Sequence, residues 1–109
     1  NDIRNVWFLA GDIHLGFVGR IEPPDHEWGH MWEITVGPGG SGVNPLGTAY
    51  EMGHVIAKDC FPCNQMLFVH AKEQATTMIE LDPVADTVHV TYTDALTNEV
   101  MFDAYLRQN

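Results

Sequence analysis

Basic residues are scarce in this sequence. Its 109 residues include 5 Lys and Arg against 15 Asp and Glu, which gives a formal net charge of −10. A chain of this charge lacks the basic surface through which proteins bind nucleic acids or anionic membranes. Both partner classes are therefore excluded for a charge-driven interaction, and the composition favours the binding of cations instead.

Long apolar runs are also missing. No segment approaches the roughly 18 consecutive apolar residues that a membrane-spanning helix needs, and no charged segment followed by an apolar one marks a signal peptide. We therefore expect no transmembrane segment. With 45% hydrophobic and 10% aromatic residues, the composition is that of a globular chain, and we expect residues 1–109 to belong to one domain.

Cysteine occurs only twice, as Cys60 and Cys63 in the stretch KDCFPCNQ. A CxxC pair is a redox motif, half of a zinc site or a local disulfide. No second CxxC completes a four-cysteine zinc site, and the NQMLFV that follows resembles a strand rather than the helix of a redox motif. We therefore predict a structural disulfide, which implies an oxidising compartment and a secreted or periplasmic protein.

The stretch HEWGH, residues 26–30, matches the HExxH motif of zinc peptidases. On a helix, His26 and His30 would share one face and bind one zinc ion, and Glu27 would act on the bound water. Gly29 and the β-branched run that begins at Ile34 leave room for two helical turns at most. We interpret both histidines as surface or loop residues and keep a small zinc peptidase as an alternative.

Most of the remaining pattern predicts strands. The apolar run of residues 5–11, which glycine ends, is typical of a strand buried on both faces. Residues 31–37 are predicted to form a second short strand that leads into a Gly/Pro-rich loop. Four β-rich segments separated by turns follow within residues 65–109, and they predict an antiparallel meander: MLFVHAK, QATTMIELD, DTVHVTYTD and EVMFDAYL.

The histidines outside HEWGH are assigned by the same pattern. Between Thr87 and Thr93 polar residues alternate with apolar ones, so His89 is expected on the solvent-facing side of its strand. His54 and His70 are expected to be structural or exposed rather than metal ligands.

The first apolar strand ends in LAGDIHLGF, which places Asp12 and His14 just beyond its carboxyl end. In open α/β sheets, binding sites form at that end of the strands. A carboxylate and an imidazole two residues apart on a turning chain can point to one metal ion, and Gly11 leaves room for the backbone to bend. The alternative is a carboxylate that caps a turn beside a structural histidine.

NVWFLAGDIHLGFVGRI resembles the last metal-binding motif of the alkaline phosphatase D-like (PhoD-like) metallophosphoesterases, an apolar strand followed by T-G-D-V-H. WEITVGPGGSGVNPLG is similar to the family's strand and glycine- and asparagine-containing loop, and the closing β segments are similar to its terminal meander. The resemblance covers nearly the whole chain, with residues 1–47 carrying the metal motif and site loops. It implies an α/β fold, namely the C-terminal portion of a calcineurin-like sandwich of two mixed sheets flanked by helices, to which this mostly β chain contributes the meander.

The same resemblance implies a function. Asp12 and His14 match the family's final pair of metal ligands, in a centre of two or more metal ions: iron and calcium, or divalent metals such as zinc or manganese. Metal-activated hydroxide would hydrolyse phosphate mono- or diesters, including phospholipid head groups in a phospholipase D-like reaction. Trp28 and Asn44 are predicted to contact the substrate, and no catalytic side chain is identified.

Earlier motifs of the family are absent from the sequence, so we do not expect it to form a complete enzyme by itself. Asn1 stands where an initiator Met would be, directly before an apolar strand. We therefore expect a C-terminal fragment, produced by proteolytic cleavage or truncation, whose partner is the N-terminal chain of the same precursor. The alternatives are the small HExxH zinc peptidase and a β-module without catalytic activity.

Overall fold

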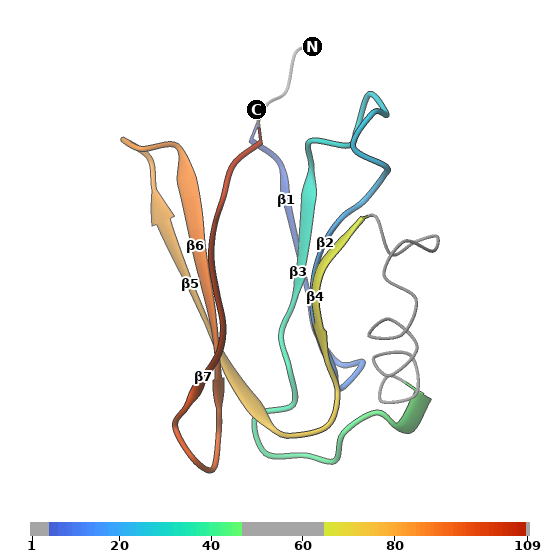
Figure 1. Ribbon diagram of the computed structural model, residues 1–109, viewed down its shortest axis with the longest axis vertical. Coiled ribbons are helices and arrows are strands. Elements are labelled where there is room, and N and C mark those ends of the chain that lie inside the picture. Colours follow the sequence, from blue (N-terminus) through green and yellow to red (C-terminus); the bar gives the residue numbers. More distant parts are fainter. Residues whose placement is uncertain (1–4, 47–64, 109) are drawn as a thin grey trace.

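The computed structural model describes residues 5–46 and 65–108, which form two β-sheets that pack face to face (Figure 1). The first sheet has four strands in the order β1-β3-β2-β4, and the second has three in the order β5-β6-β7. Their bounds are β1 Trp7–Ala10, β2 Gly16–Arg20, β3 Trp32–Thr35, β4 Met66–His70, β5 Ala75–Asp82, β6 Thr87–Asp94 and β7 Val100–Leu106. We call these the four-stranded sheet and the three-stranded sheet.

The expectation of a mostly β chain with an antiparallel meander is confirmed. Strand β6 pairs antiparallel with β5 on one side and with β7 on the other. Helix is almost absent from the described residues, so the helices expected to flank the sheets are not seen in this part of the chain. None of the described residues forms a helix long and apolar enough to cross a membrane.

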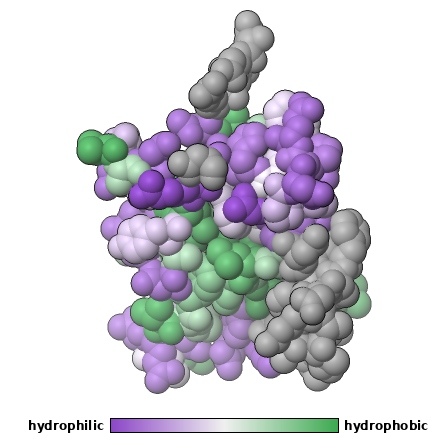
Figure 2. Space-filling view, turned by 45° about the horizontal axis from the view of Figure 1, so that its top comes forward, coloured by the Kyte–Doolittle hydropathy of each residue, from purple (hydrophilic) through white to green (hydrophobic). Residues whose placement is uncertain are grey.

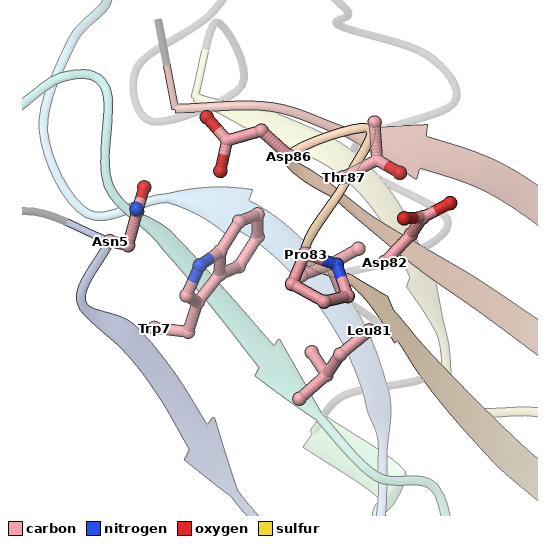
Figure 3. Close-up of a pocket in the computed structure, with 8 residues that line it drawn as sticks. Asn5, Trp7, Leu81, Asp82, Pro83, Asp86 and Thr87 are labelled. Atoms are coloured by element: carbon pink, nitrogen blue, oxygen red, sulfur yellow. The ribbon is translucent and has the colours of Figure 1, made fainter.

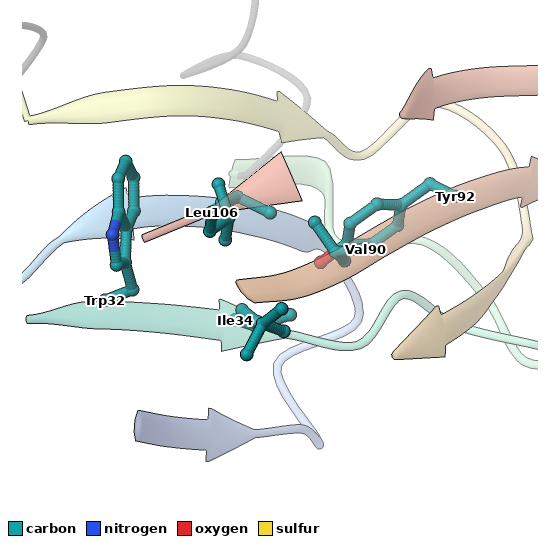
Figure 4. Close-up of a cluster of buried hydrophobic side chains, with 7 residues drawn as sticks. Trp32, Ile34, Val90, Tyr92 and Leu106 are labelled. Atoms are coloured by element: carbon teal, nitrogen blue, oxygen red, sulfur yellow. The ribbon is translucent and has the colours of Figure 1, made fainter. Parts of the chain in front are cut away.

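The hydrophobic core lies between the two sheets (Figure 4). Alternation along β6 points Val88, Val90 and Tyr92 inward, where all three are buried. They meet buried residues of the facing sheet and of the last strand: Val18, Trp32, Ile34 and Leu106. Burial of these side chains at roughly 1.5–3 kcal/mol each is the main force that holds the two sheets together.

Strand β4 was expected in the meander, and this expectation is wrong. Its residues pair antiparallel with β2, with Val69 opposite Phe17, and so belong to the four-stranded sheet. The following residues, Ala71–Gln74, carry the chain across to β5 in the other sheet. Both strands are β-rich, and their local pattern does not indicate that the turn between them changes sheets.

Strand β1 was expected to be buried on both faces, and this expectation is also wrong for the described residues. It lies at the edge of the four-stranded sheet, where it pairs with β3 alone, in parallel. Trp7 packs against the core, but Phe8 is exposed and Leu9 has 63% of its surface open to solvent. The face of the molecule shown in Figure 2 also has an apolar area between hydrophilic regions.

Candidate functional site

The turn after β1 has an unusual backbone. Asp12 and His14 have φ angles of 72° and 57°, in the left-handed region that few residues other than glycine adopt. Gly11 has no positive φ; a Cβ there would instead lie 3.2 Å from a methyl group of Val36. Left-handed residues of this kind cluster at functional sites, where the surrounding structure holds them in place.

Asn44 holds the turn in place from the Gly/Pro-rich loop. Its side-chain Nδ2 donates to the carbonyl of Ile13 at 2.8 Å, and its backbone N–H donates to the carbonyl of His14 at 3.1 Å. Its Oδ1 in turn accepts from the N–H of Leu46 at 3.0 Å. The amide predicted to contact substrate is thus used to connect two loops, which gives Asn44 a positioning role.

Three of the four predicted metal-binding and substrate-binding residues line one cavity. This cavity of about 320 Å³ is bordered by Asp12, His14, Asn44 and their neighbours Ile13, Val43 and Pro45. A second, more apolar cavity of about 500 Å³ shares Ile13 and Asn44 with the first and includes Glu33 in its lining. The carboxyl end of β1 therefore combines a carboxylate and an imidazole with an adjoining apolar cavity.

The donors of the first cavity fit a metal site in kind but not in number. A carboxylate oxygen and an imidazole nitrogen suit iron, zinc or manganese. Two-metal centres need more ligands than these, and within residues 5–46 and 65–108 no group of three or more His, Cys, Asp or Glu is placed to hold a metal ion. Any further ligands would have to come from outside the described residues.

The structure does not bring Trp28 together with Asp12 and His14. The parallel register of β1 and β3 places Trp7 beside Trp32 at one end of the sheet and Ala10 beside Thr35 at the other. Residues 21–31 lead into β3 at Trp32, whereas the Asp12 turn follows Ala10 (Figure 1). Trp28 is 46% exposed, but it lies at the opposite end of the four-stranded sheet.

The HEWGH segment forms turns, not the helix that a zinc peptidase requires. The N–H of His26 donates to the carbonyl of Pro23 at 2.9 Å, and the N–H of Gly29 donates to the carbonyl of His26 at 2.9 Å. A Cβ at Gly29 would lie 2.1 Å from the Pro23 carbonyl oxygen, so the turn itself requires this glycine. His30 Nδ1 lies 3.0 Å from the carbonyl oxygen of Glu27, within the same turn.

Two predicted features lie outside the described residues. These are the disulfide between Cys60 and Cys63, and His54.

Tyr92 is a residue that the sequence pattern did not single out for the site. Its buried hydroxyl lies 2.6 Å from the carbonyl oxygen of Thr35 and 3.1 Å from that of Phe17, and it donates its one proton to these acceptors. Burial raises the pKa of Tyr92, so the hydroxyl stays protonated. Thr35 ends β3 beside Ala10, and the next residue, Val36, donates to the Ala10 carbonyl at 2.9 Å. Tyr92 therefore connects the three-stranded sheet to the backbone that precedes the Asp12 turn.

Another cavity lies at the far end of β1, between Trp7 and the turn from β5 to β6 (Figure 3). Its volume is about 270 Å³, and its lining includes Asp82 and Asp86. Asp82 Oδ1 accepts from the N–H groups of Val84 and Ala85 at 3.0 and 2.9 Å. That carboxylate forms part of the turn, so this cavity is a weaker candidate than the one beside Asp12.

No family model matches the chain, and comparisons with curated proteins and with solved structures find no match. The resemblance to PhoD-like metallophosphoesterases rests on the sequence motifs alone.

Proposed function

We propose that this chain is the C-terminal part of a metal-dependent phosphoesterase that hydrolyses phosphate mono- or diesters, with phospholipid head groups among its substrates. One observation carries the proposal. Asp12 and His14, which match the family's last ligand pair, have left-handed backbone at the carboxyl end of a parallel strand and line one cavity. The finer assignment of the two sheets to a calcineurin-like sandwich is part of the same proposal.

In this proposal Asp12 supplies a carboxylate oxygen and His14 an imidazole nitrogen to the metal centre. Bound metal ions would supply Lewis-acid polarisation of a phosphoryl oxygen and activation of water. The hydrogen bonds of Asn44 keep both ligands on a preformed turn, so that little ordering is needed when the metal or substrate binds. The net charge of −10 is compatible with an anionic substrate because the metal ions would dominate the local potential.

The remaining ligands are assigned to the N-terminal chain of the same precursor. The described residues offer Asp12 and His14 and no group of three or more His, Cys, Asp or Glu placed to hold a metal ion. We therefore expect metal-dependent activity in the complex of the two chains and not in the isolated 109-residue chain.

The proposal is tested on protein expressed in and purified from its source. Native mass spectrometry and elemental analysis measure co-purifying polypeptide and metal, and hydrolysis of p-nitrophenyl phosphate and bis(p-nitrophenyl) phosphate measures activity. Asp12→Asn and His14→Gln should each lower the metal content and reduce hydrolysis roughly 100- to 1,000-fold, because a metal ion contributes several kcal/mol to such reactions.

Matched controls separate loss of a ligand from loss of a carboxylate or an imidazole in general. Asp86→Asn changes another aspartate with left-handed backbone (φ 55°), in the turn between β5 and β6. His26→Gln changes a histidine at the opposite end of the sheet. Both controls should keep the metal content and the activity of the unmodified protein.

A second candidate is a β-module without catalytic activity. The observation in its favour is that no group of three or more His, Cys, Asp or Glu is placed to hold a metal ion in the described part of the chain. It predicts a lone 12.2 kDa species without metal, unchanged by Asp12→Asn. That result would contradict the phosphoesterase proposal.

A further inference from the structure

The outer face of the three-stranded sheet brings together one ionisable residue from each strand. Glu80 of β5 lies directly opposite His89 of β6 in the antiparallel register. Asp103 of β7 lies opposite Thr91, one diagonal step from His89. Side chains at such positions are close enough to interact across strands. All three residues lie on the face that points away from the core.

Both ring nitrogens of His89 contact a carboxylate. Nδ1 lies 2.7 Å from Oε2 of Glu80, and Nε2 forms a hydrogen bond with Oδ1 of Asp103. A neutral imidazole has only one N–H and would turn a lone pair toward one of the two carboxylates. Only the protonated ring, with two N–H groups, can donate to both. The geometry is therefore that of an imidazolium ion between two carboxylates.

We propose that Glu80, His89 and Asp103 form a pH-sensitive clasp that holds β5, β6 and β7 together while His89 is protonated and loosens when it loses its proton. The inference does not depend on the proposed phosphoesterase function. It rests on the placement of one titratable ring between carboxylates of its two neighbouring strands.

The surroundings of the clasp are acidic. Besides Glu80, β5 contributes Asp82, which lines a cavity of about 330 Å³ with His89 and Tyr105. From β7, the Tyr105 ring stacks on the imidazole, with centroids 4.1 Å apart and planes at 6°. Thr91 of β6 itself donates to Asp103 at 3.2 Å. One basic residue, the exposed Arg107, directly follows the end of β7.

These groups set the direction of the pH effect. The hydrogen bond to Asp103 is the largest factor that raises the pKa of His89 above its ordinary value of 6.5, with a smaller contribution from Glu80. A group whose pKa is higher in the folded state stabilises that state fully below its unfolded pKa. Its stabilisation disappears as the pH rises through the folded pKa. The clasp is thus closed in mildly acidic solution and opens as the pH rises above the pKa of His89 in the folded chain.

The clasp is tested on the full 109-residue chain by NMR titration of the His89 ring C–H resonances between about pH 5 and 9, a range that spans the histidine transition. We expect a pKa above 6.5 in the unmodified chain. Glu80→Gln and Asp103→Asn should each lower it, the second by more. Glu27→Gln, which removes a carboxylate from the distant HEWGH turn, should leave it unchanged.

A second measurement follows urea unfolding of the unmodified chain and of His89→Gln across the same pH range. The difference in stability should be largest at low pH and should shrink as the pH passes the measured pKa. A His89 pKa at or below 6.5, no response to either carboxylate substitution, or a pH-independent stability difference would each overturn the proposal. The NMR titration needs no His89 variant, so it decides the matter even if His89→Gln does not fold.

Discussion

Five residues other than glycine have left-handed backbone in the described structure: Asn5, Asp12, His14, Asp86 and Asn98. Four of them are Asn or Asp, which adopt this conformation most readily because their short side chains bond to nearby backbone. The fifth residue, His14, has a larger side chain than Asn or Asp. Its conformation therefore depends most on neighbouring contacts, of which the hydrogen bond from Asn44 to its carbonyl is one.

The first prediction concerns that backbone. His14→Val should destabilise the chain by about 1–2 kcal/mol, because a β-branched residue is strained in left-handed backbone. His14→Asn, which also removes the imidazole, should cost much less. Urea unfolding of the two variants measures the difference. Equal stability of His14→Val and His14→Asn would mean that the turn relaxes and that its backbone is not held by Asn44.

The second prediction concerns the buried hydroxyl that joins the sheets. Tyr92→Phe removes the hydrogen bonds to the Thr35 and Phe17 carbonyls and should cost about 1 kcal/mol in the free energy of unfolding. Tyr105→Phe changes the same group at an exposed position of β7 and should cost little. Thermal unfolding of both variants provides the comparison, and an equal loss in the two would argue against the Tyr92 link.

At the scale of whole elements, the sequence was informative where one face of a strand is buried and the other is not. The alternation from Val88 to Tyr92 predicted both faces of β6 because solvent lies on one side and the core on the other. Strand β1 gave no such alternation. Apolar side chains on both faces of β1 are compatible with burial. Whether each face is buried depends on which other segments pack against the strand.

The pairing across the hairpin of β5 and β6 can be predicted from the sequence. Asp82 and Thr87 flank the turn between β5 and β6, and counting two residues outward from each reaches Glu80 and His89. The contact between a carboxylate and an imidazole could thus have been predicted from the sequence. The contact with Asp103 was harder to predict because the pairing of β6 and β7 shifts register between Tyr92 and Thr93.

The third prediction concerns β1, which pairs with β3 alone among the described residues. An apolar edge strand offers unpaired backbone groups to other chains, so we expect the isolated chain to self-associate through it. Leu9→Lys should reduce this association without lowering stability, because the Leu9 side chain is largely exposed. Leu96→Lys adds the same charge at an exposed position in the turn between β6 and β7 and serves as its control.

Sedimentation velocity measures the association over a range of protein concentrations. A monomeric unmodified chain would contradict the prediction. If Leu9→Lys and Leu96→Lys make the chain monomeric to the same extent, the added charge and not the edge of β1 accounts for the effect.

At the scale of the whole molecule, the net charge of −10 on 109 residues acts against the compact state through self-repulsion. The fourth prediction is that raising the monovalent salt concentration from about 0.01 M to about 0.15 M increases the melting temperature, because the screening length falls from about 30 Å to about 8 Å. Circular dichroism follows the transition, in the presence of a chelator that removes divalent ions. A melting temperature that falls or stays constant would show that attractive pairs, the His89 clasp among them, outweigh the repulsion.

The candidate site shows how far the sequence leads at this scale. A strand followed by Gly-Asp-x-His predicted the placement of Asp12 and His14 at one end of a sheet, because that inference is local. Whether Asn44 or Trp28 joins them depends on which end of the sheet each loop occupies. The parallel direction of β1 and β3 decides this, and it is set by packing across the whole molecule.

The three tryptophans lie in three different environments. Trp32 is buried. Its Nε1 donates to the Arg107 carbonyl at 2.8 Å, and the Arg20 guanidinium lies 4.3 Å from its ring centroid. Trp7 is partly buried on the edge strand, and Trp28 is exposed in the HEWGH turn. Intrinsic fluorescence should therefore have separable components. Acrylamide should quench the red-emitting Trp28 first, whereas the blue-shifted emission of Trp32 should persist until the two sheets separate. Replacing Trp28 with Phe would leave an optical probe of the sandwich itself.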